Sequence, residues 1–256
     1  MALPPNILFI GGHDPTGGAG LQADIETALA HGCRACTLVT CLTTQDSSNV
    51  RALHPQGVAT LLAQLDCLLN DIRPDVVKIG LLGAPAIARA LAGALPGLPL
   101  VIDPVLAAGG GKDVADPTLI DVIRTQLLPI TALLTPNRAE ARRLSGREDA
   151  LYAAQALVEA GCGQVLLTGA DESESGTVVN RLIGPGGQHE FEHPLLPHRY
   201  HGSGCTLASA CACNLALGMP METAVGRALD WTWNTLRQGD KPGKGQYFPN
   251  RREHVA

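Results

Sequence analysis

Gly202, Ser203 and Gly204 stand directly before a helix-length run of small residues that begins at Cys205. Consecutive main-chain N–H groups at a helix start can point at one anion, and the positive end of the helix dipole favours negative charge there. The same field lowers the pKa of a thiol, so we expect Cys205 to be a thiolate. The segment therefore predicts an anion hole for a phosphate or an oxyanion. A buried structural cysteine is the alternative interpretation of Cys205.

A glycine-rich segment spans residues 11–20 and contains five glycines. It follows a short apolar run and leads into a stretch of helical composition, so its main chain can approach a ligand closely. No Lys-Ser/Thr follows a G-x-x-x-x-G, and the segment does not fit G-x-G-x-x-G, which disfavours the P-loop and the dinucleotide-binding fingerprint. The segment predicts a second ligand-facing turn, with a plain structural turn as the alternative.

Asn137 and Glu140 follow a further apolar run, in the sequence Thr-Pro-Asn-Arg-Ala-Glu. The two side chains would share one side of a first helical turn and could hold water or Mg²⁺ near phosphates. A mutual capping role explains the same spacing equally well. Asp103, at the end of another apolar run, is a further candidate for organising the metal.

Cys33 and Cys36 have the C-x-x-C spacing, but the other close pair, Cys211 and Cys213, has one intervening residue. The two-pair spacing of a zinc site is therefore absent, and we expect neither a zinc nor a redox site. A long apolar chain with its own core does not need disulfides, so we expect most of the eight cysteines to be free, buried thiols.

The composition excludes several classes of function. The net charge of −5 comes without a basic stripe, which disfavours nucleic-acid binding. The longest apolar region, residues 81–102, contains Arg89 and three prolines, so we expect no membrane-spanning helix. The first residues lack the charged and apolar regions of a signal peptide, which predicts a cytoplasmic protein.

Short apolar runs alternate with stretches of helical length, and this order predicts βαβ units and a parallel sheet. The predicted strands are residues 7–10, 37–42, 76–79, 98–102, 132–134 and 165–167. The predicted helices among them are residues 19–30, 58–69, 85–94 and 151–160. Ligands of such a sheet collect at the carboxyl ends of its strands, where the polar turns of this chain lie.

The pattern changes after residue 176. Residues 177–191 contain two short apolar runs around a Gly-Pro-Gly-Gly turn, which predicts an antiparallel hairpin added to the sheet. Two further helices, near residues 204–217 and 221–236, are predicted to close the chain. We expect residues 1–256 to form one domain.

Five segments carry a family resemblance: residues 13–24 (HDPTGGAGLQAD), 78–82 (KIGLL), 103–105 (DPV), 135–140 (TPNRAE) and 201–207 (HGSGCTL). In this order they resemble the hydroxymethylpyrimidine and phosphomethylpyrimidine kinases of thiamine biosynthesis, members of the ribokinase superfamily. The similarity runs over nearly the whole chain. It implies a three-layer α/β/α ribokinase-like fold with a mostly parallel central sheet. It also implies a requirement for ATP and Mg²⁺, and stepwise phosphorylation of hydroxymethylpyrimidine to its diphosphate.

By matching positions, the resemblance implies a role for each candidate residue. The implied substrate-binding residues are Ala19, Asp24, Gln45 and Val105, with the Gln45 amide facing the amino edge of the pyrimidine. The implied ATP-binding residues are Asn137, Thr168 and Lys112, and the implied metal ligands are Asp103 and Glu140. The implied catalytic residues are Gly202, Ser203, Gly204 and Cys205.

Three positions depart from the commoner pattern of the family. Thr168 stands where many relatives carry Lys, so one contact to a nucleotide phosphate is absent or supplied elsewhere. Residues 109–112 (GGGK) replace a Ser-Gly turn, and Lys112 in this flap could be a mobile phosphate ligand. Asp46 stands where Asn is frequent, next to Gln45.

The wider superfamily of sugar kinases places an Asp general base where this chain has Cys205. Removing a proton from an alcohol needs a base, whereas a phosphate monoester is already anionic. We therefore expect a Cys205 thiolate to assist phosphorylation of the alcohol, and the second phosphorylation to depend less on it. The alternatives are a pyridoxal kinase of the same fold, a non-catalytic pyrimidine-binding sensor and a cysteine-dependent hydrolase. The family resemblance also implies a homodimer.

Overall fold

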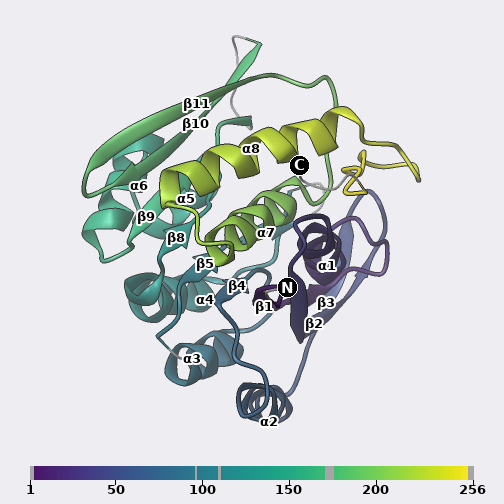
Figure 1. Cartoon of the computed structure of the whole chain (residues 1–256), viewed down its shortest axis with the longest axis vertical. Coiled ribbons are helices and arrows are strands. Elements are labelled where there is room, and N and C mark those ends of the chain that lie inside the picture. The colour runs from purple at the N-terminus through teal and green to yellow at the C-terminus, as the bar shows by residue number, and fades with distance from the viewer. Residues whose placement is uncertain (1–2, 96, 109–110, 171–175, 253–256) are drawn as a thin grey trace.

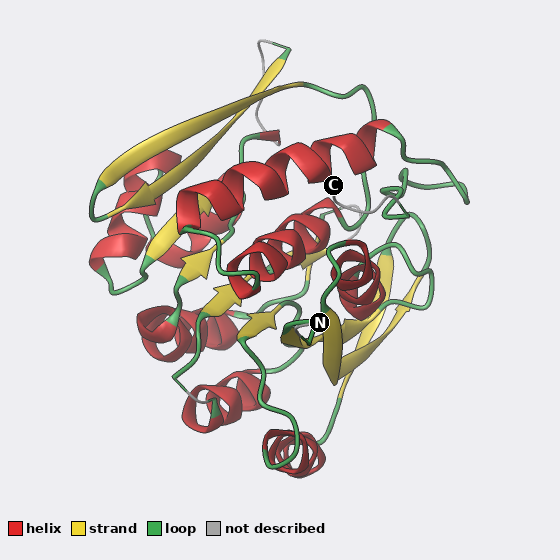
Figure 2. Cartoon of the chain, in the orientation of Figure 1, coloured by secondary structure: helices red, strands yellow, loops and turns green. Residues whose placement is uncertain are grey.

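The computed structural model describes residues 3–95, 97–108, 111–170 and 176–252. These residues form a nine-stranded sheet in the order β11-β10-β9-β8-β5-β4-β1-β2-β3. Figure 2 shows the strands in yellow and the helices that surround them in red. The strands are β1 (Asn6–His13), β2 (Arg34–Gln45), β3 (Val50–Pro55), β4 (Val76–Ile79), β5 (Leu100–Ile102), β8 (Leu133–Leu134), β9 (Gln164–Leu167), β10 (Thr177–Gly184) and β11 (Gly187–Pro194).

The centre of the sheet is parallel and its two ends are antiparallel. Strand β1 pairs in parallel with β2 and β4, and the parallel pairing continues through β5, β8 and β9. At one end β3 is antiparallel to β2, and at the other end β10 and β11 form an antiparallel hairpin. The prediction of a mostly parallel sheet with an added hairpin is confirmed.

Helices cover both faces of the sheet. They are α1 (Gly20–Ala30), α2 (Val58–Leu69), α3 (Pro85–Ala94), α4 (Pro117–Val122), α5 (Arg138–Ser145), α6 (Ala150–Glu159), α7 (Ser203–Ala216) and α8 (Met221–Arg237). Helices α1, α7 and α8 lie on one side of the sheet in Figure 1, and α2 to α6 pack against the other side.

Successive side chains of β1 pack alternately against these two layers of helices. Ile7 and Phe9 are buried with residues of α1, α7 and α8. Leu8 and Ile10 are buried with residues of α2 to α6. Successive side chains of a strand point to opposite faces, so an apolar strand without polar alternation predicts helices on both sides. The three-layer α/β/α architecture is confirmed.

The structure also contains elements that the sequence pattern did not predict. Strand β3 pairs with the end of β2, and a two-stranded ribbon of β6 (Ala107–Ala108) and β7 (Lys112–Asp113) follows β5. Helix α4 continues into a π-helical turn, Ile123–Leu127, and a short 3-10 turn, Leu128–Ile130. Gly109 and Gly110 of the predicted flap lie outside the described residues. No helix in the described part of the chain has the length and apolar character to span a membrane.

Candidate active site

The candidate residues gather at the carboxyl edge of the parallel strands, beside the start of α7. Asp103 comes directly after β5, and it lies against Gly204 in the first turn of α7. A Cβ atom built on Gly204 would be 3.5 Å from Asp103 Oδ2. The expected meeting of strand ends and the predicted anion hole is therefore present.

Helix α7 begins without a side-chain cap. Its N-cap is Gly202, which has a φ of 80° and whose carbonyl accepts the Thr206 N–H at 2.9 Å and the Thr206 hydroxyl at 2.7 Å. A side chain at position 202 would collide with the Gly18 carbonyl oxygen. Because no side chain caps the first turn, its main-chain N–H groups are available to an anion.

The glycine-rich loop is held by Asp14. The Asp14 carboxylate accepts hydrogen bonds from the Thr16 N–H at 2.8 Å, the Ala19 N–H at 2.9 Å and His201 Nε2 at 2.8 Å. Burial alone would raise the pKa of Asp14, but the hydrogen bonds from His201 and Thr16 outweigh it and hold the pKa below its usual value. The Asp14–His201 contact ties the loop before α1 to the segment before α7.

The expectation of a Cys205 thiolate is not met, because the surroundings of the thiol raise its pKa. Desolvation of this half-buried thiol and the neighbouring carboxylates of Asp103 and Asp24 together raise the pKa of Cys205 to about 12, against the opposing effect of Lys78. The Cys205 thiol donates to the Asp103 carboxylate. The desolvation and the two carboxylates therefore outweigh the helix dipole.

Asp24, which the resemblance implies as a substrate-binding residue, is fully buried in this structure. Its carboxylate pairs with Lys78 Nζ at 2.8 Å, with both side chains at most 1% exposed, and accepts a hydrogen bond from the Ser209 hydroxyl at 2.6 Å. Burial would lower the pKa of Lys78, but the charges of Asp24, Cys205 and Asp103 raise it above its usual value. Asp24 thus fixes a buried ammonium group beneath the anion hole.

Asp103 has a raised pKa, chiefly because it is buried. Lys78 and the Cys205 thiol act in the opposite direction. A buried carboxylate beside an ammonium group and a thiol can accept a proton more readily than an ordinary Asp.

Asn137 and Glu140 form a reciprocal capping box at the start of α5, so the capping alternative is confirmed. The Asn137 side chain accepts the Glu140 N–H at 2.8 Å, and Glu140 Oε2 accepts the Asn137 N–H at 3.0 Å. Glu140 Oε1 accepts the Leu106 N–H at 3.2 Å, which joins α5 to the loop after β5. Thr168 lies beside Asn137, because the ends of β8 and β9 continue as a parallel bridge between these two residues.

The remaining candidate residues follow other elements of the sheet and its loops. Ala19 is the N-cap of α1, Gln45 is the partly buried last residue of β2, and Val105 follows Asp103. Lys112 reaches in the other direction and donates to the Arg51 carbonyl at 2.6 Å. The structure therefore places Lys112 against β3, at the opposite end of the sheet from Asn137 and Thr168.

Mg²⁺ takes oxygen ligands and commonly binds through one or two carboxylates together with substrate phosphates. Asp103 and Glu140 offer ligands of this class. Both Glu140 oxygens accept main-chain N–H groups, and a carboxylate oxygen has more than one lone pair. Among the described residues, no group of three or more His, Cys, Asp or Glu side chains could hold a metal ion. The donor set therefore fits a cation shared with phosphates and does not form an all-protein cage.

Sequence reasoning missed Arg251, which is 4% exposed and lies within this cluster. Its guanidinium donates to the Gly18 carbonyl, to Thr206 Oγ1 at 2.8 Å and to Glu26 Oε2 at 3.1 Å. No sequence signal could have found it, because it lies 45 residues or more from each of these partners along the chain.

The cysteines are free thiols, as predicted, and all but Cys67 and Cys205 are buried. Cys33 does not pair with Cys36. The Cys33 side chain instead lies in hydrogen-bonding contact with Cys213 of α7, and this contact lowers the pKa of Cys33.

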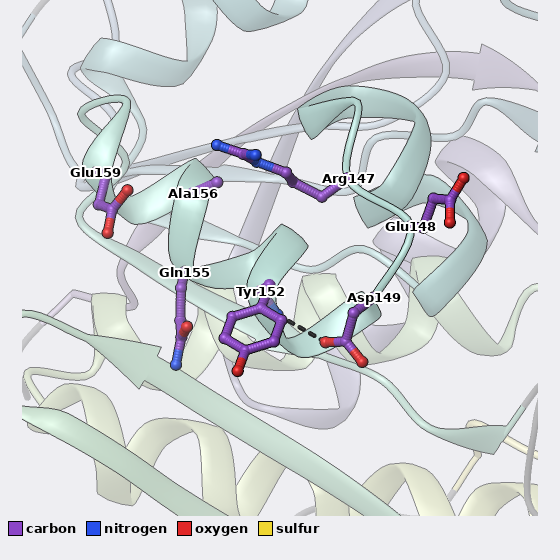
Figure 3. Close-up of a pocket in the computed structure, with 7 residues that line it drawn as sticks. All are labelled: Arg147, Glu148, Asp149, Tyr152, Gln155, Ala156 and Glu159. Atoms are coloured by element: carbon purple, nitrogen blue, oxygen red, sulfur yellow. Dashed lines mark hydrogen bonds between the residues drawn. The ribbon is translucent and has the colours of Figure 1, made fainter.

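Cys205 lines neither of two hollows in the described part of the chain. The larger, of about 680 Å³, runs between the outer side of the glycine-rich loop, α1 and the segment after α8. The smaller, of about 320 Å³, lies along α6 and the loop 147–149 that precedes it (Figure 3), where Asp149 accepts the N–H of the exposed Tyr152. Its lining contains none of the candidate residues, so we do not assign it to the active site.

Comparisons with known proteins agree on one family. The sequence profile described as phosphomethylpyrimidine kinase matches residues 14–250. The hydroxymethylpyrimidine/phosphomethylpyrimidine kinase of Synechococcus elongatus is 37% identical over 254 residues, which cover 94% of this chain and 95% of that protein. The thiamine biosynthesis bifunctional protein ThiED of Geobacter sulfurreducens is 35% identical over 94% of this chain, and the match spans 51% of that longer protein.

Solved structures are similar over most of the chain. The pyridoxal kinase of Staphylococcus aureus, in complex with AMP-PCP and pyridoxal, has a TM-score of 0.90 at 25% identity and covers 100% of this chain and 98% of its own. The phosphomethylpyrimidine kinase of Clostridium difficile has a TM-score of 0.77 at 28% identity and covers 91% of this chain and 99% of its own.

Proposed function

The chain belongs to the phosphomethylpyrimidine kinase family, and from that premise we propose that it transfers a phosphoryl group from ATP to hydroxymethylpyrimidine phosphate. The product is the diphosphate used in thiamine biosynthesis. The free alcohol is the second substrate and gives the monophosphate.

The observation that carries the proposal is the uncapped start of α7 beside the glycine-rich loop. Gly202 has no side chain to satisfy the first N–H groups, and Gly204 brings Asp103 against the same turn. Phosphoryl transfer needs little covalent chemistry from a protein, so positioning and charge stabilisation supply most of the catalysis. The free N–H groups of α7 serve that purpose.

The protonated thiol of Cys205 favours the monophosphate as the easier substrate. A phosphate monoester already carries a nucleophilic oxygen anion, whereas the alcohol must lose a proton. Cys205 donates to Asp103, whose raised pKa makes it the carboxylate that can take this proton. In this proposal Cys205 orients the reacting oxygen, and Asp103 accepts the proton when the alcohol reacts.

The nucleotide and the metal belong to the other side of the same edge. AMP-PCP in the S. aureus pyridoxal kinase supports ATP as the phosphoryl donor. Asn137 and Thr168, adjacent at the ends of β8 and β9, would contact ATP. Glu140 would hold Mg²⁺ with the phosphates, with Asp103 as a second ligand when the monophosphate reacts and no proton acceptor is needed. Bound Mg²⁺ would neutralise charge on the transferred phosphoryl group. Ala19, Gln45 and Val105 would contact the pyrimidine.

Product analysis with both pyrimidines tests the proposal. The purified protein is incubated with ATP, Mg²⁺ and either the alcohol or its monophosphate, and the products are separated by ion-exchange chromatography. We expect diphosphate from the monophosphate, and monophosphate followed by diphosphate from the alcohol. Consumption of neither pyrimidine would exclude the proposed function and would leave a pyridoxal kinase or a non-catalytic binding protein as the remaining interpretations.

Pyridoxal is a second candidate substrate, because the pyridoxal kinase of S. aureus has the higher TM-score of the two solved structures. Pyridoxal also presents a hydroxymethyl group on an aromatic ring. Competition between pyridoxal and hydroxymethylpyrimidine in one reaction measures the ratio of their kcat/KM values. Turnover of pyridoxal alone would replace the pyrimidine in the proposal.

We also propose a homodimer in the cytoplasm. Light scattering of the purified protein gives the mass that decides the oligomeric state, and cell fractionation decides the compartment.

A further inference from the structure

The segment after α8, residues 239–252, contacts the turn after β2, the glycine-rich loop and the start of α7. Its Gly245 and Gln246 N–H groups donate to Ser47, two residues beyond Gln45, at 3.0 and 2.9 Å. Its Tyr247 carbonyl accepts the His201 N–H at 2.8 Å. Its Phe248 ring packs against His201, with ring centroids 5.5 Å apart. We call residues 239–252 the C-terminal segment.

Arg251 is the charged residue of this segment that is buried against the loops of the site. Its side chain is 2% exposed, and it donates to partners on three separate elements. A buried guanidinium costs free energy unless its donors are bonded, and its planar fork suits several fixed acceptors at once. These acceptors are the Gly18 carbonyl, Thr206 Oγ1 and Glu26 Oε2.

A relay connects Arg251 to the anion hole. Arg251 Nε donates to Thr206 Oγ1, and the Thr206 hydroxyl donates in turn to the Gly202 carbonyl. In a trans peptide the C=O and N–H groups point in opposite directions. Since the Gly202 carbonyl is held from within the helix, the Ser203 N–H of the same peptide points out of the start of α7.

The same guanidinium holds the glycine-rich loop against the anion hole. It bonds the Gly18 carbonyl oxygen, the atom with which any side chain at position 202 would collide. One side chain therefore fixes both Gly18 and Gly202, at the contact where the two loops meet. Neither loop can move relative to the other without breaking a hydrogen bond to Arg251.

We propose that Arg251 is a positioning residue for phosphoryl transfer: through Thr206 and Gly18 it orients the N–H groups that stabilise the transferred phosphate. This inference rests on the proposed kinase activity. It adds a residue that acts from behind the anion hole and does not touch the substrate.

The variant Arg251→Ala tests the proposal. We expect kcat for the monophosphate to fall about 100-fold, because small displacements of positioning groups have effects of that size. The KM for the pyrimidine should change less than about threefold, since Gln45 is held by β2. Added guanidinium ion at millimolar concentration should restore part of kcat, which general destabilisation would not allow.

The matched control is Arg252→Ala, which removes the same charge from the adjacent, exposed residue. Its kcat should equal that of the wild type. An Arg251→Ala protein that is folded by circular dichroism and retains wild-type kcat would overturn the proposal. A loss of kcat equal to the fraction of unfolded protein would also overturn it.

Thr206→Val supplies a second test if Arg251→Ala does not fold. Valine keeps the shape of the side chain and removes the hydroxyl that connects Arg251 to Gly202. We expect kcat to fall about tenfold, the equivalent of one charge-assisted hydrogen bond. Unchanged kcat in this variant would show that the relay does not position the anion hole.

Binding of AMP-PCP distinguishes failure of this inference from failure of the proposed function. Isothermal titration calorimetry measures the affinity of the protein for AMP-PCP with no pyrimidine present. Arg251→Ala should weaken AMP-PCP binding about tenfold, and Arg252→Ala should not. A wild type that is inactive on pyrimidines but shows this difference would refute the substrate and support the positioning role. Equal affinities in the two variants would refute the positioning role.

Discussion

Helices α5 and α7 both begin at the carboxyl edge of the sheet, but only α5 has side chains that accept hydrogen bonds from its first N–H groups. At α5 the side chains of Asn137 and Glu140 cap the helix reciprocally. At α7 the N-cap is Gly202, which offers no side chain, and charged groups lie beneath the first turn. The difference is that α5 satisfies its first N–H groups with its own side chains, whereas α7 leaves them without a side-chain acceptor, as the proposed anion hole requires.

The largest effect should come from giving the start of α7 a side chain. Gly202→Ala would collide with the Gly18 carbonyl and would occupy a φ of 80°, so the loop must move. We expect kcat/KM to fall about 1000-fold, the upper range for loss of oxyanion-hole groups. Steady-state kinetics with the monophosphate measure it.

Gly146→Ala is the matched control at the end of α5. Its φ is 73°, yet its added Cβ would meet no atom within 4 Å. This variant should lower the free energy of unfolding by about 1 kcal/mol and leave kcat unchanged. If both variants keep full activity, the uncapped start of α7 does not contribute to catalysis.

Cys205→Ala sharpens the comparison at the first turn of α7. Because Cys205 contacts Asp103, the proposed proton acceptor, we expect about a 100-fold fall in kcat for the alcohol and less than about a threefold fall for the monophosphate, which needs no base. Parallel assays of both substrates measure the ratio. An equal loss on the two substrates would refute a special role of Cys205 in alcohol phosphorylation.

Glu140→Ala tests the capped helix. The variant removes the acceptor for the Leu106 and Asn137 N–H groups, so we expect the free energy of unfolding to fall by about 2 kcal/mol in urea denaturation. Asp149→Ala, which removes the N-cap of α6, is the control with an expected loss of about 1 kcal/mol. A raised KM for Mg²⁺ in Glu140→Ala alone would show that the capping residue also serves the metal.

The smallest effect concerns Asp14, which caps main-chain groups of the loop before α1. Its pKa is lower in the folded protein than in the unfolded chain, so its contribution to stability is complete above about pH 4 and is lost as the pH falls through the folded pKa. The free energy of unfolding of Asp14→Asn should therefore decrease less below about pH 4 than that of the wild type, by about 1 kcal/mol. Exposed Asp121→Asn should leave that slope unchanged. Urea denaturation at several pH values tests this sign.

The framework of the fold could be predicted from sequence because its signals are local. Apolar runs without polar alternation mark β1 and β4 as strands covered on both faces, and the small residues after Gly202 mark the start of α7. Strand β3 was missed because Val50–Pro55 contains Arg51, His54 and Pro55, which hide a strand that pairs on one side only.

The pKa values and partners of the site residues could be predicted only in part, because they depend on residues that are distant in the sequence and close in the fold. The helix dipole at Cys205 is a local signal, but the opposing carboxylates of Asp24 and Asp103 are not. Asp24 lies in a matched segment of the family, yet its buried pairing with Lys78 follows from the packing of α1 against β4 and α7. Arg251 had no local signal at all.

The contact between Gly18 and Arg251 also has a consequence for how the protein is synthesised. It joins residues that are 233 positions apart, and the Asp14–His201 contact spans 187 positions. Strands β1 to β9 can leave the ribosome long before Arg251 is added, so a growing chain can assemble most of its sheet without a finished anion hole. The ability to position a phosphate would therefore be acquired near the end of translation.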